Sequence, residues 1–199
     1  IFPYLYSLLQ FNSFETLSTI NEFFEDSILN DDNNSHLTRQ YIIEALFDIY
    51  EVNETTFTDF DRCQLAIFVA RNYPKYSQFI RLSESVLSSI IDDLCTVTNQ
   101  DIKYDCELAL QSLLPLYEPD GELFLLDKLK SARFYSVLIS IYRSKGKYSN
   151  VLKTWLEKSQ QESTENDTLS GILEEAFIYT KSHACLLYTS PSPRDMRRS

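Results

Sequence analysis

The chain of 199 residues has little glycine, histidine or methionine. Its three glycines, Gly121, Gly146 and Gly171, stand apart, so no glycine-rich loop of the kind that cradles phosphate groups is present. His36 and His183 are the only histidines, and no C-x-x-C pair occurs, which argues against a histidine triad or a structural zinc site. We therefore predict no catalytic residue, no metal ligand and no cofactor.

The sequence also lacks long apolar runs and an excess of positive charge. No apolar run approaches the roughly 18 residues needed to cross a bilayer. The 18 Lys and Arg residues are outnumbered by 29 Asp and Glu residues, which gives a net charge of −11. Because such a surface repels phosphates, we expect no nucleic-acid partner and at most peripheral contact with membranes. Acidic residues that share a helix face, such as Glu44 and Asp48, fit a solvated face better than an acid–base pair.

The two ends of the sequence do not look like the natural ends of a protein. The first residue is Ile1 and the only methionine is Met196, which predicts that the chain is a piece of a longer protein. The run CLLYTSPSPRD at 185–195 resembles a translated sequencing adaptor, with a natural Ser/Pro-rich tail as the alternative. We expect one native region at 1–184 and a non-native tail at 185–199 that packs against nothing.

Three cysteines precede that tail, at Cys63, Cys95 and Cys106. Their odd number and wide spacing fit reduced thiols in the core of a cytoplasmic protein better than a disulfide framework or metal ligands.

Apolar residues recur at helical spacing along most of the chain, and sustained two-residue alternation is absent, so we predict an all-α fold. Short polar breaks between stripes of similar length, including one at Asn72 and Pro74, indicate an α-solenoid of stacked antiparallel hairpins. A single compact bundle is the alternative. The clearest stripes are Ile42/Ala45/Leu46/Ile49/Tyr50, Val86/Leu87/Ile90/Ile91/Leu94 and Ile102/Cys106/Ala109/Leu110/Leu113.

The segment 131–157 is the clearest hairpin. Gly146 falls where the first helix must end, a position that often needs a positive φ, and Lys145 and Lys147 suit the negative end of that helix. Gly171 is expected inside a last helix. The two predicted inward stripes are Phe134/Leu138/Ile141/Tyr142 and Tyr148/Val151/Leu152/Trp155/Leu156.

Positive charge gathers in one stretch of the sequence, which overlaps this hairpin. The cluster is a candidate contact for an acidic partner subunit or for lipid headgroups, and the alternative is the solvated face of two helices. Its members are Lys128, Lys130, Arg133, Arg143, Lys145, Lys147 and Lys153.

Two sets of motifs resemble known proteins. The Gly-Lys-Tyr at 146–148 with the Leu-x-x-Trp-Leu at 152–156 resembles the helical repeats of clathrin heavy chain and of vacuolar sorting proteins. The longer runs IFPYLYSLLQF at 1–11 and FTDFDRCQLAIFVARNYPKY at 57–76 resemble the central region of the fungal vacuolar protein sorting-associated protein 8 family.

The resemblance implies a subunit of CORVET, the complex that tethers early endosomal membranes before fusion. Implied partners are the other tether subunits and, through the whole parent protein, an endosomal Rab GTPase, with a cytoplasmic location at endosomal or vacuolar membranes. We therefore expect a scaffold segment and not an enzyme. Three alternatives stay open: a generic clathrin-repeat adaptor, a paralogue from the HOPS tether, or a non-catalytic helical domain of a larger enzyme.

Overall fold

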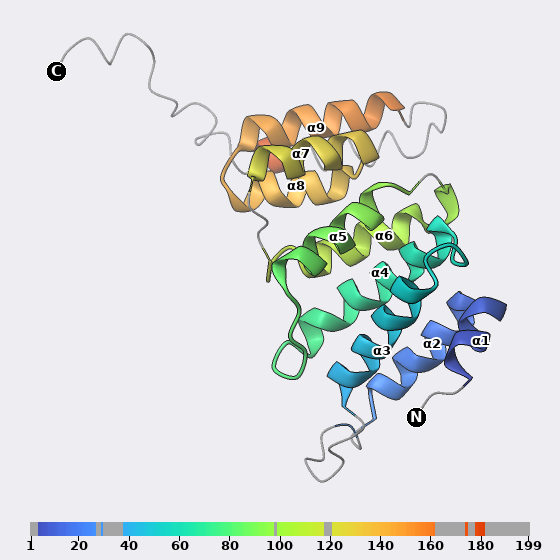
Figure 1. Cartoon of the computed structure of the whole chain (residues 1–199). Helices are drawn as coiled ribbons and strands as arrows, with labels where there is room; N and C mark the ends of the chain where they lie inside the picture. Colours follow the sequence, from blue (N-terminus) through green and yellow to red (C-terminus); the bar gives the residue numbers. More distant parts are fainter. Residues whose placement is uncertain are drawn as a thin grey trace. The chain divides into compact units, whose positions relative to one another are not determined.

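A computed structural model of the chain is all-helical over the residues that it describes, which are 4–26, 29, 38–97, 99–117, 121–161, 174 and 178–181 (Figure 1). These residues contain no strand, so the predicted fold class is confirmed at the level of all-α. The helices are α1 (Leu5–Phe11), α2 (Ser13–Phe24), α3 (Arg39–Val52), α4 (Asp59–Lys75), α5 (Glu84–Cys95), α6 (Gln100–Leu113), α7 (Glu122–Ala132), α8 (Tyr135–Ser144) and α9 (Tyr148–Gln161).

Five of the helices, α2 to α6, begin where the sequence provides a capping side chain. Asn12, Thr38, Ser83 and Asn99 each accept a hydrogen bond from a main-chain N–H in the first turn of the helix that follows. Thr58 forms a reciprocal capping box with the third residue of α4. Such caps satisfy main-chain donors that have no partner inside the helix, and each contributes about 1 kcal/mol.

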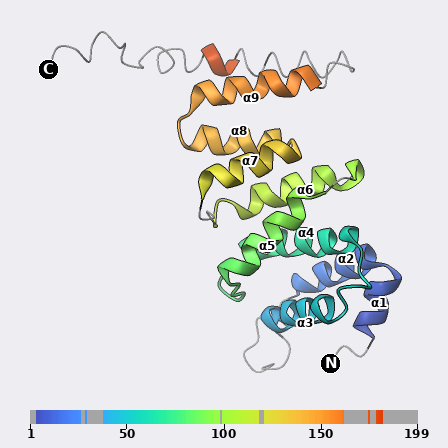
Figure 2. The same cartoon turned by 45° about the horizontal axis from the view of Figure 1, so that its top comes forward.

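The chain forms two compact units, residues 1–132 and 133–199. In the first unit, α4 packs between α2 and α6, while α5 packs against α4, α6 and α7 (Figure 2). Every residue of α4 from Cys63 to Ala70 is buried, because neighbouring helices cover it on several sides. The predicted stripes of α5 and α6 are buried as well, apart from Val86 at the edge.

One predicted break is wrong. We expected the helix to stop at Asn72 and Pro74, but α4 continues through Pro74 to Lys75. Proline removes only one N–H in the last turn, and the preceding turns are fixed by packing in the core. Asn72 is buried, and its side-chain Nδ2 donates to the Phe68 carbonyl at 2.9 Å and to Asn21 Oδ1 of α2 at 2.8 Å.

The second unit contains the hairpin of α8 and α9, which pack against each other. Gly146 has a φ of +65°, as predicted, and the N–H of Lys147 donates to the carbonyl of Tyr142 at 2.8 Å to close the end of α8. Phe134, Leu138, Tyr142, Val151 and Trp155 are buried as predicted.

The second predicted stripe is wrong at one position. Leu156 is 56% exposed, whereas Thr154 is buried and its hydroxyl donates to the Asn150 carbonyl at 2.8 Å. Because that bond satisfies the hydroxyl, Thr154 can lie in the core. The apolar pattern had instead predicted that Leu156 faces the core.

Several predictions fall on residues outside the described part of the chain. These are the positions of His36, Gly171 and His183 and the packing of the tail at 185–199. Among the helices that the structure describes, none is long and apolar enough to cross a membrane.

Candidate interaction surfaces

The predicted basic cluster is divided between the two units. Lys128 and Lys130 belong to α7 of the first unit, and the other five residues belong to the second. Around the turn between α8 and α9, Arg143, Lys145 and Lys147 lie within five residues of sequence, and their side chains are exposed. Cations at this end of α8 also interact favourably with the helix dipole.

Lys128 is already engaged within the first unit. Its ammonium forms an ion pair with the Asp92 carboxylate of α5 and lies 4.1 Å from the centre of the Phe124 ring. The lysine therefore links α7 to α5, and the structure supports a packing role for it more than a role in binding. Lys130 is exposed on the same helix.

Arg143 has an aromatic setting that sequence analysis missed. Its guanidinium carbon lies 5.8 Å from the centre of the Trp155 ring and 5.2 Å from that of Tyr179, within cation–π range. Trp155 and Tyr179 meet edge to face with ring centres 5.0 Å apart, and both are buried. The signal in the sequence was the spacing of Arg143 and Trp155 across a three-residue turn, but Tyr179 lies too far along the chain to be placed from a pattern.

A second arginine, Arg39, is buried in the first unit and was also missed. Only 2% of it is exposed. Its Nε and Nη2 donate to the Phe24 carbonyl at 3.0 and 2.7 Å, and the guanidinium stacks over the Tyr76 ring at 4.3 Å. Arg39 thus joins the end of α2, the start of α3 and the residues that follow α4. Nothing in the local pattern distinguishes it from a solvated arginine.

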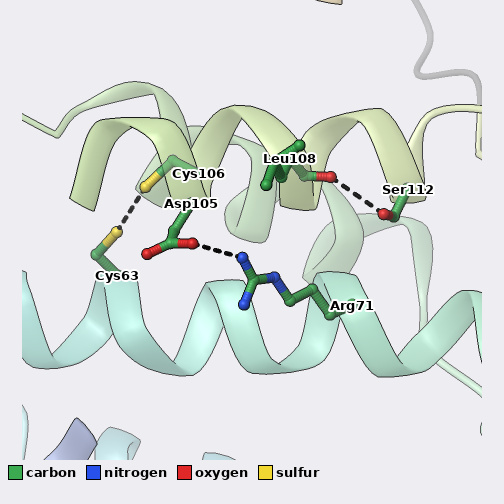
Figure 3. Close-up of polar contacts among 6 residues, drawn as sticks. All are labelled: Cys63, Arg71, Asp105, Cys106, Leu108 and Ser112. Carbon is green, nitrogen blue, oxygen red and sulfur yellow. Dashed lines mark hydrogen bonds and ion pairs between the residues drawn. The ribbon is translucent and has the colours of Figure 1, made fainter.

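The three cysteines within the described part of the chain form no disulfide with one another. Cys63 of α4 and Cys106 of α6 are buried and point towards each other (Figure 3), with sulfur atoms 3.3 Å apart. Cys95 is partly buried. The contact with Cys106 and burial raise the pKa of the Cys63 thiol well above its ordinary range, and burial raises that of Cys95 to about 12. The predicted burial is seen for Cys63 and Cys106, whereas Cys95 is only partly buried.

No group of three or more His, Cys, Asp or Glu side chains is arranged to hold a metal ion among the residues described above. The ionisable side chains with perturbed pKa values belong to caps, helix contacts and the core. Tyr50 and Asp93 line one pocket together with Arg62, and burial is the largest cause of the raised pKa of each.

The packed helical hairpins place the chain in the class of all-helical proteins, and sequence comparison narrows that class. No protein-family model matches the chain. Vacuolar protein sorting-associated protein 8 of Saccharomyces cerevisiae is 36% identical over 182 residues, which cover 87% of this chain and 14% of that protein. The protein of the same name from Schizosaccharomyces pombe is 25% identical over 146 residues, or 71% of this chain and 11% of that protein.

The chain is therefore a homologue of one part of vacuolar protein sorting-associated protein 8, and it matches only a small share of the length of these much larger relatives. The resemblance predicted from its motifs is confirmed.

Proposed function

We propose that the chain is a section of α-solenoid that acts as a scaffold in a subunit of an endosomal tethering complex of the CORVET type. It acts in vesicle-mediated transport and endosome fusion through protein–protein contacts. The observation that supports this proposal best is the row of α2, α4 and α6, in which α4 is covered on both sides by equivalent helices. Rows of this kind extend by adding further hairpins, and their faces serve as binding surfaces.

The partners in this proposal are the other subunits of the tether and, through the whole parent protein, an endosomal Rab GTPase. The parent protein would be cytoplasmic and attached peripherally to endosomal or vacuolar membranes. Homology to proteins named for vacuolar sorting supports this assignment over the generic adaptor and over a helical domain of an enzyme.

The exposed basic residues of the second unit are the proposed contact for an acidic partner surface. Arg143, Lys145, Lys147 and Lys153 are exposed, in a chain whose net charge is −11. A local surface of opposite sign to the rest of the protein would orient an acidic partner and speed its association. The solvated face of two helices is the competing interpretation.

A chimera tests the scaffold proposal. Residues 1–184 would replace the matching segment of the Saccharomyces cerevisiae protein at its own locus. We expect the other CORVET subunits to co-purify with the chimera and vacuolar cargo to be sorted. A chimera that accumulates normally and is folded, yet co-purifies with HOPS subunits only or with no tether subunit, would overturn the assignment.

A second chimera, which carries Arg143→Glu, Lys145→Glu and Lys147→Glu together, tests the basic surface. Loss of one subunit from the purified complex, with normal protein level, would support the contact. Unchanged co-purification would identify these residues as a solvated face.

A further inference from the structure

A groove of about 760 Å³ opens on the first unit along the row of α2, α4 and α6. Leu17, Ile67, Phe68 and Leu108 give it an apolar lining, and Phe14 at its edge is half exposed. Figure 3 shows part of this region, where Arg71 of α4 points towards α6 and Leu108 and Ser112 follow one another along α6. An exposed apolar hollow of this size marks a surface that can bury a partner's side chains.

Each of the three helices contributes one side-chain amide to the lining: Asn21 from α2, Gln64 from α4 and Gln111 from α6. Gln64 is only 7% exposed, yet it makes no hydrogen bond to any residue that the structure describes. The same holds for Gln111, which is partly buried. The amide atoms of both residues are open to solvent and not sealed in the core, so each keeps a donor and an acceptor that a ligand in the groove can bond.

The charge of the groove is opposite to that of the chain. Its lining includes Arg71 and Lys75, one turn apart on α4, and no acidic residue. Arg71 is paired with Asp105 at 2.7 Å, whereas Lys75 is exposed and forms no ion pair with the described residues. One end of the groove therefore offers a free cation.

We propose that this groove binds an extended polypeptide segment of a partner protein, with apolar side chains at alternate positions and an acidic residue at the end that meets Lys75. A carboxamide carries both a donor and an acceptor, which match the C=O and N–H of an extended main chain. A helical ligand fits less well, because its main-chain groups are bonded internally.

The length of the groove sets the length of the segment. Gln64 and Lys75 are eleven residues apart on one helix, a separation of about 16 Å along its axis. An extended chain rises about 3.3 Å per residue, so about five residues span that distance. Two apolar side chains of such a segment, directly before and after its central residue, would face the floor of the groove. This inference goes beyond the scaffold role and does not depend on membership of a tether.

The test uses the full chain and an array of fluorescein-labelled, end-capped pentapeptides. Positions 2 and 4 carry Leu, Ile or Phe, position 3 carries Ser, and positions 1 and 5 carry Glu, Ser or Lys, so either direction of binding is covered. Fluorescence anisotropy measures the affinity of each peptide. We expect the Glu peptides to bind about tenfold more tightly than the Lys peptides, as for one favourable charge contact.

Two variants ask whether the peptides occupy the groove. Gln64→Met keeps the side chain's size and removes its hydrogen-bonding groups, and because the amide has no partner the variant should fold normally. Lys75→Glu reverses the free charge. Each should weaken the Glu peptides about tenfold, whereas the exposed controls Gln78→Met and Arg81→Glu should have no effect.

The outcomes separate the occupants. Failure of every pentapeptide to bind, or binding that neither groove variant weakens, would overturn the proposal. Binding that strengthens when the peptides are extended to helical length and carry the same side chains would also overturn it, in favour of a helix. Circular dichroism of each variant excludes unfolding as the cause of a loss.

Discussion

Asp61 shows how one carboxylate can serve two structural purposes. Its Oδ2 accepts from the Thr58 N–H at 2.9 Å and from the Thr58 hydroxyl at 2.7 Å, which caps α4. Its Oδ1 accepts from the Ser13 hydroxyl at 2.5 Å, which joins the start of α4 to the start of α2. Burial alone would raise the pKa of Asp61, but the hydrogen bonds from Ser13 and Thr58 outweigh it and lower the pKa.

We expect Asp61→Asn to lower the melting temperature at pH 7 and to lose that effect in acid. A folded-state pKa below the unfolded value means that the charged form stabilises the fold above the ordinary pKa of about 4. This stabilisation is lost as the pH falls through the folded-state pKa. Thermal melts of both proteins between pH 7 and about pH 3 should converge, and a constant difference would contradict the linkage.

For Asp93→Asn we expect the opposite change in melting temperature at pH 7 to that of Asp61→Asn. Burial raises the pKa of Asp93, with Asp92 and Asp59 adding to the rise and Arg62 reducing it. The charged form then costs stability at neutral pH, and that cost disappears as the pH falls through the raised pKa to below the unfolded value. The variant should melt higher than the unmodified chain at pH 7. A lower melting temperature would show that the Asp93 charge is favourably paired.

The thiols provide a third prediction at this scale. Since burial raises the pKa of Cys95 to about 12 and that of Cys63 rises as well, almost no thiolate of either residue exists at pH 7.5. In a Cys185→Ser variant of the full chain, iodoacetamide should label these residues far more slowly than in the same protein unfolded in urea. Mass spectrometry of the peptides measures each rate. Labelling of the native protein at the rate of a free peptide thiol would contradict the burial.

At the scale of elements, Arg39 holds together segments that the hydrophobic pattern does not connect. Its guanidinium reaches two further carbonyls, those of Asp26 at 3.3 Å and Leu29 at 3.4 Å, besides that of Phe24. A helix whose last carbonyls are buried needs such donors, because the helix itself provides none.

Arg39→Lys should therefore destabilise the chain by about 2 kcal/mol although the charge is retained. An ammonium is a point donor and cannot copy the planar fork that serves several carbonyls while it stacks on Tyr76. Urea unfolding followed by circular dichroism measures the loss. Arg62→Lys is the control, since the Arg62 pair with Glu54 is exposed and should change stability by about 0.5 kcal/mol or less.

The elements also show what the sequence could predict. The apolar period and the polar breaks indicated most helices, because burial of an apolar stripe depends on residues that are close in sequence. The continuation of α4 through Pro74 and the exposure of Leu156 were not predictable, since both depend on neighbours that no local pattern reveals. For the same reason the groove was missed: Gln64 resembles any surface glutamine until α2 and α6 are placed beside it.

At the scale of the whole molecule, the chain has two compact units, and each contains a different candidate surface. The first contains the amide-lined groove, and the second contains most of the predicted basic cluster. Sequence reasoning grouped the seven basic residues because they follow one another along the chain. The structure instead assigns Lys128 to the packing of α7 on α5, which leaves the residues around the α8–α9 turn as the better candidates for a partner.

Substitutions in the Trp155 hairpin test the stability of the second unit together with the proposed assembly. The ring is 5% exposed and packs on Tyr179 beneath Arg143. Trp155→Asp removes that large side chain and buries a charge, so we expect a loss of roughly 4 kcal/mol or more, out of a typical 5 to 15 for a domain. Glu157→Ala, at an exposed position two residues further along α9, should cost about 0.5 kcal/mol or less.

Thermal melts of the chain and co-purification of tether subunits with the full parent protein measure the two consequences separately. In the proposed solenoid, neighbouring hairpins would support one another, so we expect loss of this hairpin to weaken the proposed assembly and sorting and Glu157→Ala to leave both intact. If Trp155→Asp keeps the melting temperature of the unmodified chain but fails to assemble, the tryptophan acts at an interface and not in the core. If the variant has a lower melting temperature yet assembles normally, the second unit is dispensable for the scaffold. The proposed role then rests on the row of α2, α4 and α6 alone.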